Sequence, residues 1–192
     1  MTIRVLGVDP GLTRCGVGVI DVEPSRKVTL VLVDVFKSET NLDSATRVGV
    51  VAVKLAELID RVKPQSIAIE RVYADSNVST VMGTAQISGV VMYLAHTRGI
   101  PVTLHTPTEV KAAVTGSGRA NKDQVGKMVA SILGLKEVPK PADAADSLAI
   151  AICHAWRALA VASGLTSESI TPAQKAWRAA EIAAQHKVQS SR

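Results

Sequence analysis

The hydrophobic residues at the start of the chain come in continuous runs, not at helical spacing. Three aliphatic stretches, at residues 3–9, 14–22 and 28–36, follow one another with short polar connections at residues 10–13 and 23–26. Continuous apolar runs bounded by turn residues are typical of buried strands, and such short connections join antiparallel neighbours. The sequence therefore predicts that the chain opens with a three-stranded meander.

After residue 43 the hydrophobic period changes. Apolar positions between residues 44 and 63 recur every three or four residues, which predicts a helix that Pro64 terminates. Further strands are predicted at residues 66–70 and 100–105, with a helix at about 78–98 between them. Strands that alternate with helices need parallel crossovers. We therefore expect an α/β fold with a five-stranded mixed sheet, antiparallel at first and then parallel.

Capping residues predict the remaining helices. Residues 106–109 and 121–124 each place a Thr or Asn cap three positions before Glu or Gln, the pattern of a capping box. A long Ala-rich helix is predicted at residues 142–162. Residues 163–192 are more polar, which indicates a mobile or weakly helical tail behind a single domain formed by residues 1–162.

Size and charge narrow the class of protein. The 192 residues are enough for one full-sized domain, and a net charge of +5 favours a polyanionic partner such as nucleic acid. Only five residues are aromatic: Phe36, Tyr73, Tyr93, Trp156 and Trp177. The core must therefore be aliphatic, and Tyr73 stands out because it lies in a polar loop.

The compartment follows from what the sequence lacks. The apolar run at the N-terminus is interrupted by Asp9, too early for a signal peptide, and no stretch reaches about 18 uninterrupted apolar residues. Cys15 and Cys153 sit in apolar segments, where cysteine behaves as a small core residue. We expect a cytoplasmic protein without a membrane partner.

Four acidic residues occupy positions with chemical meaning. Asp9 ends the first predicted strand and Glu70 ends the fourth. If the first strand is central and the fourth is parallel to it, both carboxylates lie at the carboxyl edge of the sheet, where α/β proteins bind ligands. Asp143 and Asp146 share one face at the start of an apolar helix.

The helical pair has two interpretations. In the first, Asp143 and Asp146 only complement the dipole of their helix. However, two ionised carboxylates at a buried helix end repel each other and need a cation. Acids contributed singly from separate segments are the usual ligands of Mg²⁺ or Mn²⁺, and two such ions about 4 Å apart can hydrolyse a phosphodiester. The four acids thus indicate a nuclease.

Four segments together resemble the RuvC family of Holliday junction resolvases. They are GVDPG at residues 7–11, GVG at 16–18, AIERVY at 68–73 and ADAADSLAIA at 142–151. The resemblance covers about residues 3–160. It implies an RNase H-like fold with helices on both faces of the sheet, and a homodimer acting on four-way DNA junctions.

The resemblance also implies an activity and partners. Members make paired, symmetric nicks in recombination and repair, depend on Mg²⁺, and work with the branch-migration proteins RuvA and RuvB. Two Mg²⁺ ions per active site are expected, with Mn²⁺ able to substitute. The positions that match the family's catalytic and metal-binding acids are Asp9, Glu70, Asp143 and Asp146. Because the third position is His in some members, Asp143 implies an all-carboxylate site.

Four further residues are candidate DNA contacts. Tyr73 matches the family's aromatic residue near the junction centre, although its ring could instead fold over the sheet edge. Lys111 and Lys122 match its basic positions. Lys122 begins a capped helix, where a cation is unfavourable unless an anion binds there, and Arg119 completes a possible phosphate cradle. Three more lysines fit a solvated basic face equally well: Lys127, Lys136 and Lys140.

The helix at 78–98 is apolar around more of its circumference than one buried face needs, and we assign part of it to the dimer contact. Two alternative functions remain open. The DPGLT segment at residues 9–13 also resembles the phosphate-binding hairpin of actin-like and sugar-kinase ATPases, but those bind nucleotide between two such domains. A non-catalytic DNA-binding module would leave the paired acids unexplained.

Overall fold

The computed structural model describes residues 2–71 and 78–162. The chain divides into two compact units after Trp156. The sheet and its helices belong to the first unit, apart from the last helical residues, 157–162. The predicted tail at 163–192 lies outside the described residues, so the division at residue 162 stays a prediction.

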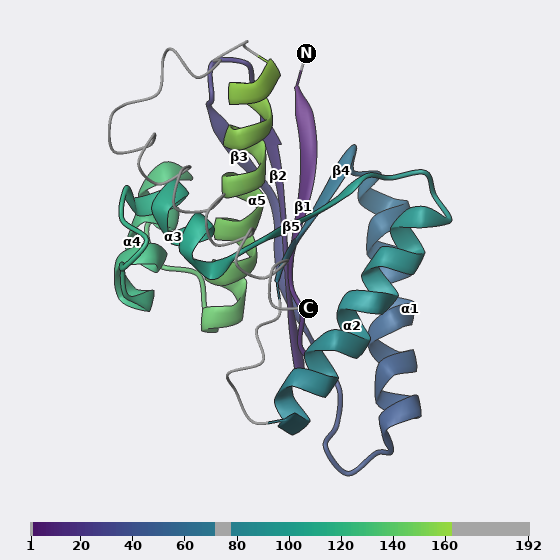
Figure 1. Ribbon diagram of the computed structural model, residues 1–192. Helices are drawn as coiled ribbons and strands as arrows, with labels where there is room; N and C mark the ends of the chain where they lie inside the picture. The colour runs from purple at the N-terminus through teal and green to yellow at the C-terminus, as the bar shows by residue number, and fades with distance from the viewer. Residues whose placement is uncertain (1, 72–77, 163–192) are drawn as a thin grey trace, which may run out of the picture. The chain divides into compact units, whose positions relative to one another are not determined.

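A five-stranded sheet runs through this first unit (Figure 1). Its strands are β1 (Ile3–Asp9), β2 (Arg14–Val22), β3 (Val28–Lys37), β4 (Ser66–Glu70) and β5 (Val102–His105). The spatial order is β3-β2-β1-β4-β5, with β1, β2 and β3 antiparallel and β4 and β5 parallel to β1. The predicted meander and the mixed sheet are confirmed, and β1 lies at the centre of the sheet.

Helices cover both faces of the sheet, as Figure 1 shows. One face carries α1 (Ser44–Val62) and α2 (Val78–His96), and the other carries α3 (Pro107–Thr115), α4 (Lys122–Ile132) and α5 (Ala142–Ala162). α2 ends two residues earlier than predicted, and β5 begins two residues later. Gly99 has a φ of 66° and Ile100 donates its N–H to the carbonyl of Ala95, so the turn after α2 takes up these residues.

Both predicted capping boxes are present. Thr106 Oγ1 accepts the N–H of Glu109 at 3.2 Å, and Glu109 Oε2 accepts the N–H of Thr106 at 2.7 Å. At the start of α4, Asn121 and Gln124 make the same reciprocal pair, both at 2.9 Å. These bonds satisfy backbone N–H groups that the helix leaves unpaired. At Asn121 they also fix the start of α4 at Lys122.

The core is aliphatic, as the composition requires. Valine, leucine and isoleucine side chains from α1 and α2 pack on one sheet face, and Cys15 and Cys153 are buried free thiols. On the other face lies α5. By length and composition residues Ala142–Val161 could span a membrane, but 56% of that stretch is buried, as in the core helix of a sheet protein.

Candidate active site

Two of the predicted acids meet at the edge of the sheet. Asp9 is the last residue of β1 and Glu70 the last residue of β4. The strands are parallel neighbours, with Val8 paired to Ile69 in the register. The two carboxylates therefore follow adjacent strand ends on the carboxyl side of the sheet, as predicted.

Glycines in β1 and β2 bring the other two acids to the same place. Gly16 lies opposite Asp9 in the antiparallel register, and a Cβ on Gly16 would overlap the carbonyl oxygen of Asp143. A Cβ on Gly7 would likewise overlap the carbonyl oxygen of Ser147. The first turns of α5 therefore rest directly on the backbone of the sheet, which places Asp143 beside Asp9.

Electrostatics shows that the four carboxylates act on one another. Burial and then repulsion from Glu70, Asp146 and Asp143 raise the pKa of Asp9 to about 8, while Lys122 opposes the rise. Burial and Asp146 also raise the pKa of Glu70, against the attraction of Lys122 and Lys111. Three segments of the chain thus assemble one cluster, which we call the acid cluster: Asp9, Glu70, Asp143 and Asp146.

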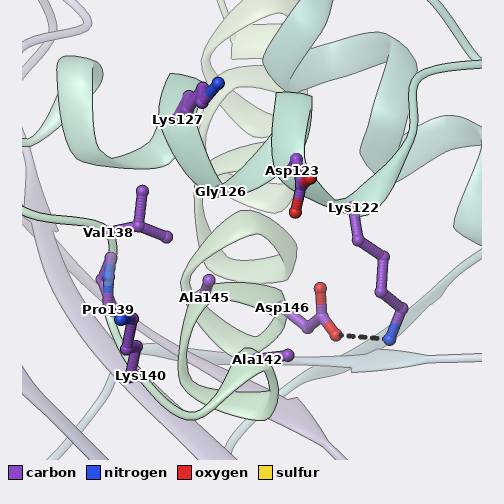
Figure 2. A pocket seen from close by; sticks show the side chains of 10 residues that line it. All are labelled: Lys122, Asp123, Gly126, Lys127, Val138, Pro139, Lys140, Ala142, Ala145 and Asp146. Atoms are coloured by element: carbon purple, nitrogen blue, oxygen red, sulfur yellow. Dashed lines mark hydrogen bonds and ion pairs between the residues drawn. The ribbon is translucent and has the colours of Figure 1, made fainter.

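Two cations pair with the acid cluster. Lys122 Nζ lies 3.2 Å from Asp146 Oδ2, a bond drawn in Figure 2. Attraction to Asp146 is the main reason that the pKa of Lys122 is raised. Arg14 Nε lies 3.0 Å from Asp143 Oδ2. Lys122 was predicted from the sequence as a phosphate ligand, whereas Arg14 was not predicted at all.

The place of Arg14 in the sequence could have indicated this contact. Arg14 begins β2, two residues before Gly16, the partner of Asp9 in the register. A basic residue so close to that position can reach an acid at the start of α5.

The donor set fits a hard divalent cation. Asp143 Oδ2 is buried and accepts no hydrogen bond within the described residues, so its contact with Arg14 is one of charge alone. Four mutually repelling carboxylates with no sulfur or imidazole among them are the ligands that Mg²⁺ and Mn²⁺ prefer. As the side chains stand, no three such groups in residues 2–71 and 78–162 converge closely enough to hold an ion. The ion pairs of Arg14 and Lys122 would have to open for a metal to bind.

The other predicted contacts lie at different distances from the acid cluster. Lys111 is half-buried on α3 and lowers the pKa of Glu70. Arg119 is exposed, and within the described residues its guanidinium makes no ion pair with the acids. Tyr73 lies outside the described residues.

Two histidines make hydrogen bonds that the sequence did not indicate. His105 Nε2 lies 3.2 Å from His154 Nδ1, and His154 Nε2 lies 3.1 Å from Ser66 Oγ. This chain of hydrogen bonds ties β5, α5 and β4 together. No spacing in the sequence pairs residues 49 positions apart.

Comparisons with known proteins agree with this geometry. A family model described as crossover junction endodeoxyribonuclease RuvC matches residues 5–154. The RuvC protein of Paenarthrobacter aurescens is 58% identical over 190 residues, covering 97% of this chain and 100% of that protein. The RuvC of T. thermophilus, solved in complex with a Holliday junction substrate, superposes with a TM-score of 0.78 at 36% identity, covering 82% of this chain and 95% of that one.

A more distant structure shares the fold. The yeast mitochondrial Holliday junction resolvase Ydc2 superposes with a TM-score of 0.60 at 16% identity, covering 82% of this chain and 81% of that one. The RNase H-like arrangement of sheet and helices is thereby confirmed. Taken together, the acid cluster, the fold and the match over most of its length show that the chain belongs to the RuvC family of crossover junction endodeoxyribonucleases.

Proposed function

We propose that this protein resolves four-way DNA junctions by paired, symmetric, divalent-metal-dependent hydrolysis of phosphodiesters during recombination and repair. The observation that carries the proposal is the acid cluster, in which carboxylates from β1, β4 and α5 gather at the carboxyl edge of the sheet. There burial and the neighbouring acids raise the pKa of Asp9 and of Glu70. Neither the ATPase nor the silent DNA-binding alternative accounts for that convergence.

The acid cluster would hold the metal, two Mg²⁺ ions per site with Mn²⁺ as a substitute. A divalent cation there would polarise the scissile phosphate and lower the pKa of bound water. Lys122 would exchange Asp146 for a phosphate oxygen, and half-buried Lys111 would contribute a second positive charge next to Glu70. Arg119 and Tyr73 would contact the DNA further out, the tyrosine by stacking on a base.

A homodimer would place two acid clusters on one junction. The exposed side of α2 carries residues at helical spacing, and most of them are apolar or small: Met82, Ala85, Gln86, Gly89, Met92 and Tyr93. Met82 is 56% and Tyr93 is 65% exposed, although the opposite side of α2 is buried in the core. An apolar stripe on an element already anchored on its other side is typical of an interface between subunits.

The remaining parts of the proposal concern the cell. We place the protein in the cytoplasm, with RuvA and RuvB as partners, and we assign catalysis to residues 1–162. A chain ending at residue 162 should nick junctions as the full chain does.

The test is a synthetic four-way junction incubated with Mg²⁺, with the nicks mapped on each strand. Paired nicks across strands of like polarity are expected. Asp146→Asn should abolish nicking and leave junction binding in Ca²⁺ largely intact, because contacts with phosphates supply most of the affinity. If Asp146→Asn loses binding and nicking together, the acid serves folding and not chemistry. ATP hydrolysis without nicks would restore the ATPase alternative.

A further inference from the structure

A pocket of about 280 Å³ lies next to the acid cluster, between α4 and the start of α5. Figure 2 shows Lys122 and Asp146 at one end of this pocket and Val138, Pro139 and Lys140 at the other. Because Asp146 belongs to both, and Lys122 pairs with it, the pocket opens directly from the proposed cleavage site.

Two lysines that make no ion pair within the described part of the chain line this pocket. Lys127 comes from α4 and Lys140 from the segment before α5, and both side chains are exposed. Within residues 2–71 and 78–162 neither makes an ion pair, whereas Lys122 is held by Asp146. Lys136, which the sequence grouped with them, does not line the pocket. The structure thus separates the lysines that the sequence left equivalent.

The inner surface of the pocket is mostly apolar. Val138 and Pro139 form one wall, and Ala142 and Ala145 of α5 form another. A Cβ on Gly126 would lie 2.8 Å from Val138 Cγ1, so the wall packs closely against α4. The carboxylates of Asp123 and Asp146 also line the pocket, on the side of Lys122. The apolar walls suit the C–H groups of a sugar, and the ammonium groups of Lys127 and Lys140 are available to a phosphate.

The size of the pocket limits what it can hold. Pockets for small molecules start at about 300 Å³, and duplex DNA is far larger. With a volume of about 280 Å³, this pocket can take only a small part of a DNA strand. A single strand that continues from a phosphate at Asp146 would enter the pocket with its next sugar and phosphate.

We propose that this pocket is a binding site for the backbone unit next to the scissile phosphate, with Lys127 and Lys140 neutralising that neighbouring phosphate. The inference rests on the proposed function, because it takes the scissile phosphate to lie at the acid cluster. Holding the adjacent unit fixes the strand against sliding, so the site selects which phosphate meets the metal ligands.

The first experiment measures junction binding in Ca²⁺ over a range of salt concentrations. The test variant is Lys127→Ala/Lys140→Ala, and the control is Lys37→Ala/Lys54→Ala, which removes the same charge from exposed residues of β3 and of α1, the helix on the other sheet face. Each lost phosphate contact should reduce the slope of log affinity against log salt by about one unit. We expect this reduction in the test variant, no change in the control, and recovery of the slope in Lys127→Arg/Lys140→Arg.

The second experiment locates the contact. Junctions carrying one uncharged methylphosphonate are prepared, with the modification at each phosphate around the cut in turn. The wild type and the control should lose about fivefold in affinity when the neighbouring phosphate is neutral, which is about 1 kcal/mol. The test variant should lose nothing further there, because its contact with that phosphate is already absent.

The outcomes separate this inference from the proposed function. An unchanged salt slope in the test variant overturns the inference, as does an equal loss for wild type and test variant at every modified phosphate. In both cases the paired nicks made by the wild type would leave the proposed function standing. If the wild type makes no nicks in an unmodified junction, the proposed function fails and this inference fails with it.

Discussion

Replacing Asp9 by Asn should stabilise the protein in the absence of metal while abolishing its activity. In the folded protein the pKa of Asp9 is raised from 3.8 to about 8 by burial and by its three acidic neighbours. A group whose pKa is raised on folding gives its full stability below the unfolded pKa and loses it as pH rises toward the folded pKa. The wild type should therefore become less stable between about pH 4 and pH 8.

The magnitude follows from the same two pKa values. At pH 7 an unfolded Asp9 is ionised and the folded one mostly protonated, which costs the folded state about 4 kcal/mol relative to low pH. Because Asp9 keeps some contact with solvent, we expect at least half of this, about 2 kcal/mol. Asn has a similar shape and no charge to lose. For a domain of this size, 2 kcal/mol corresponds to roughly 4–8 °C in melting temperature.

The assay is thermal or urea unfolding in EDTA at half-unit steps from pH 5 to pH 8. The wild type should lose up to about 1.4 kcal/mol per pH unit more than Asp9→Asn. Glu57→Gln, which alters an exposed acid on α1, should follow the wild type. Parallel curves for the wild type and Asp9→Asn would refute the view that Asp9 is held protonated by its neighbours. Adding Mg²⁺ should stabilise the wild type more than the variant.

Three further predictions concern residues around the site. Arg14→Ala should tighten Mn²⁺ binding by up to about fivefold in calorimetric titrations, because the metal no longer has to displace the guanidinium from Asp143. Weaker Mn²⁺ binding would show instead that Arg14 helps to shape the site. Lys122→Ala should weaken junction binding and lower its salt slope by about one unit, and an unchanged slope would remove Lys122 from the DNA interface. Tyr93→Glu should convert the dimer into a monomer in sedimentation experiments, because dimerisation through α2 would bury the glutamate charge in an apolar interface. A dimer that persists in this variant would place the interface elsewhere.

Local chemistry made much of the fold predictable from the sequence. The capping boxes at Thr106 and Asn121 each depend on two residues three positions apart, so the sequence alone reveals them. The first strand and the start of α5 at Ala142 were predicted to the residue. The convergence of Asp9 and Glu70 needed one further step, the rule that parallel strands share an edge.

What the sequence could not supply depends on contacts between distant segments. The pairing of Arg14 with Asp143 requires the register of β2 and the position of α5 together. The distinction between Lys140 and Lys136 depends on the path of the chain between α4 and α5, which has no hydrophobic period to follow. The candidate acids could therefore be identified from the sequence, but of the two cations that pair with them only Lys122 was predicted.

The glycines beneath α5 have a consequence for the kind of ion that the proposed metal site would prefer. At Gly16 the helix touches the sheet backbone to backbone, so the spacing between Asp143 and Asp9 is fixed by the thickness of two main chains. No change of side-chain rotamer alters that spacing. Mg²⁺ binds oxygen at 2.0–2.1 Å and Ca²⁺ at 2.3–2.6 Å, a difference of a few tenths of an ångström per ligand. Even the single methyl group of an alanine at position 16 would lift the helix by more than that. The ion selectivity of the proposed metal site would thus depend partly on Gly16, a residue that has no side chain and does not bind the metal itself.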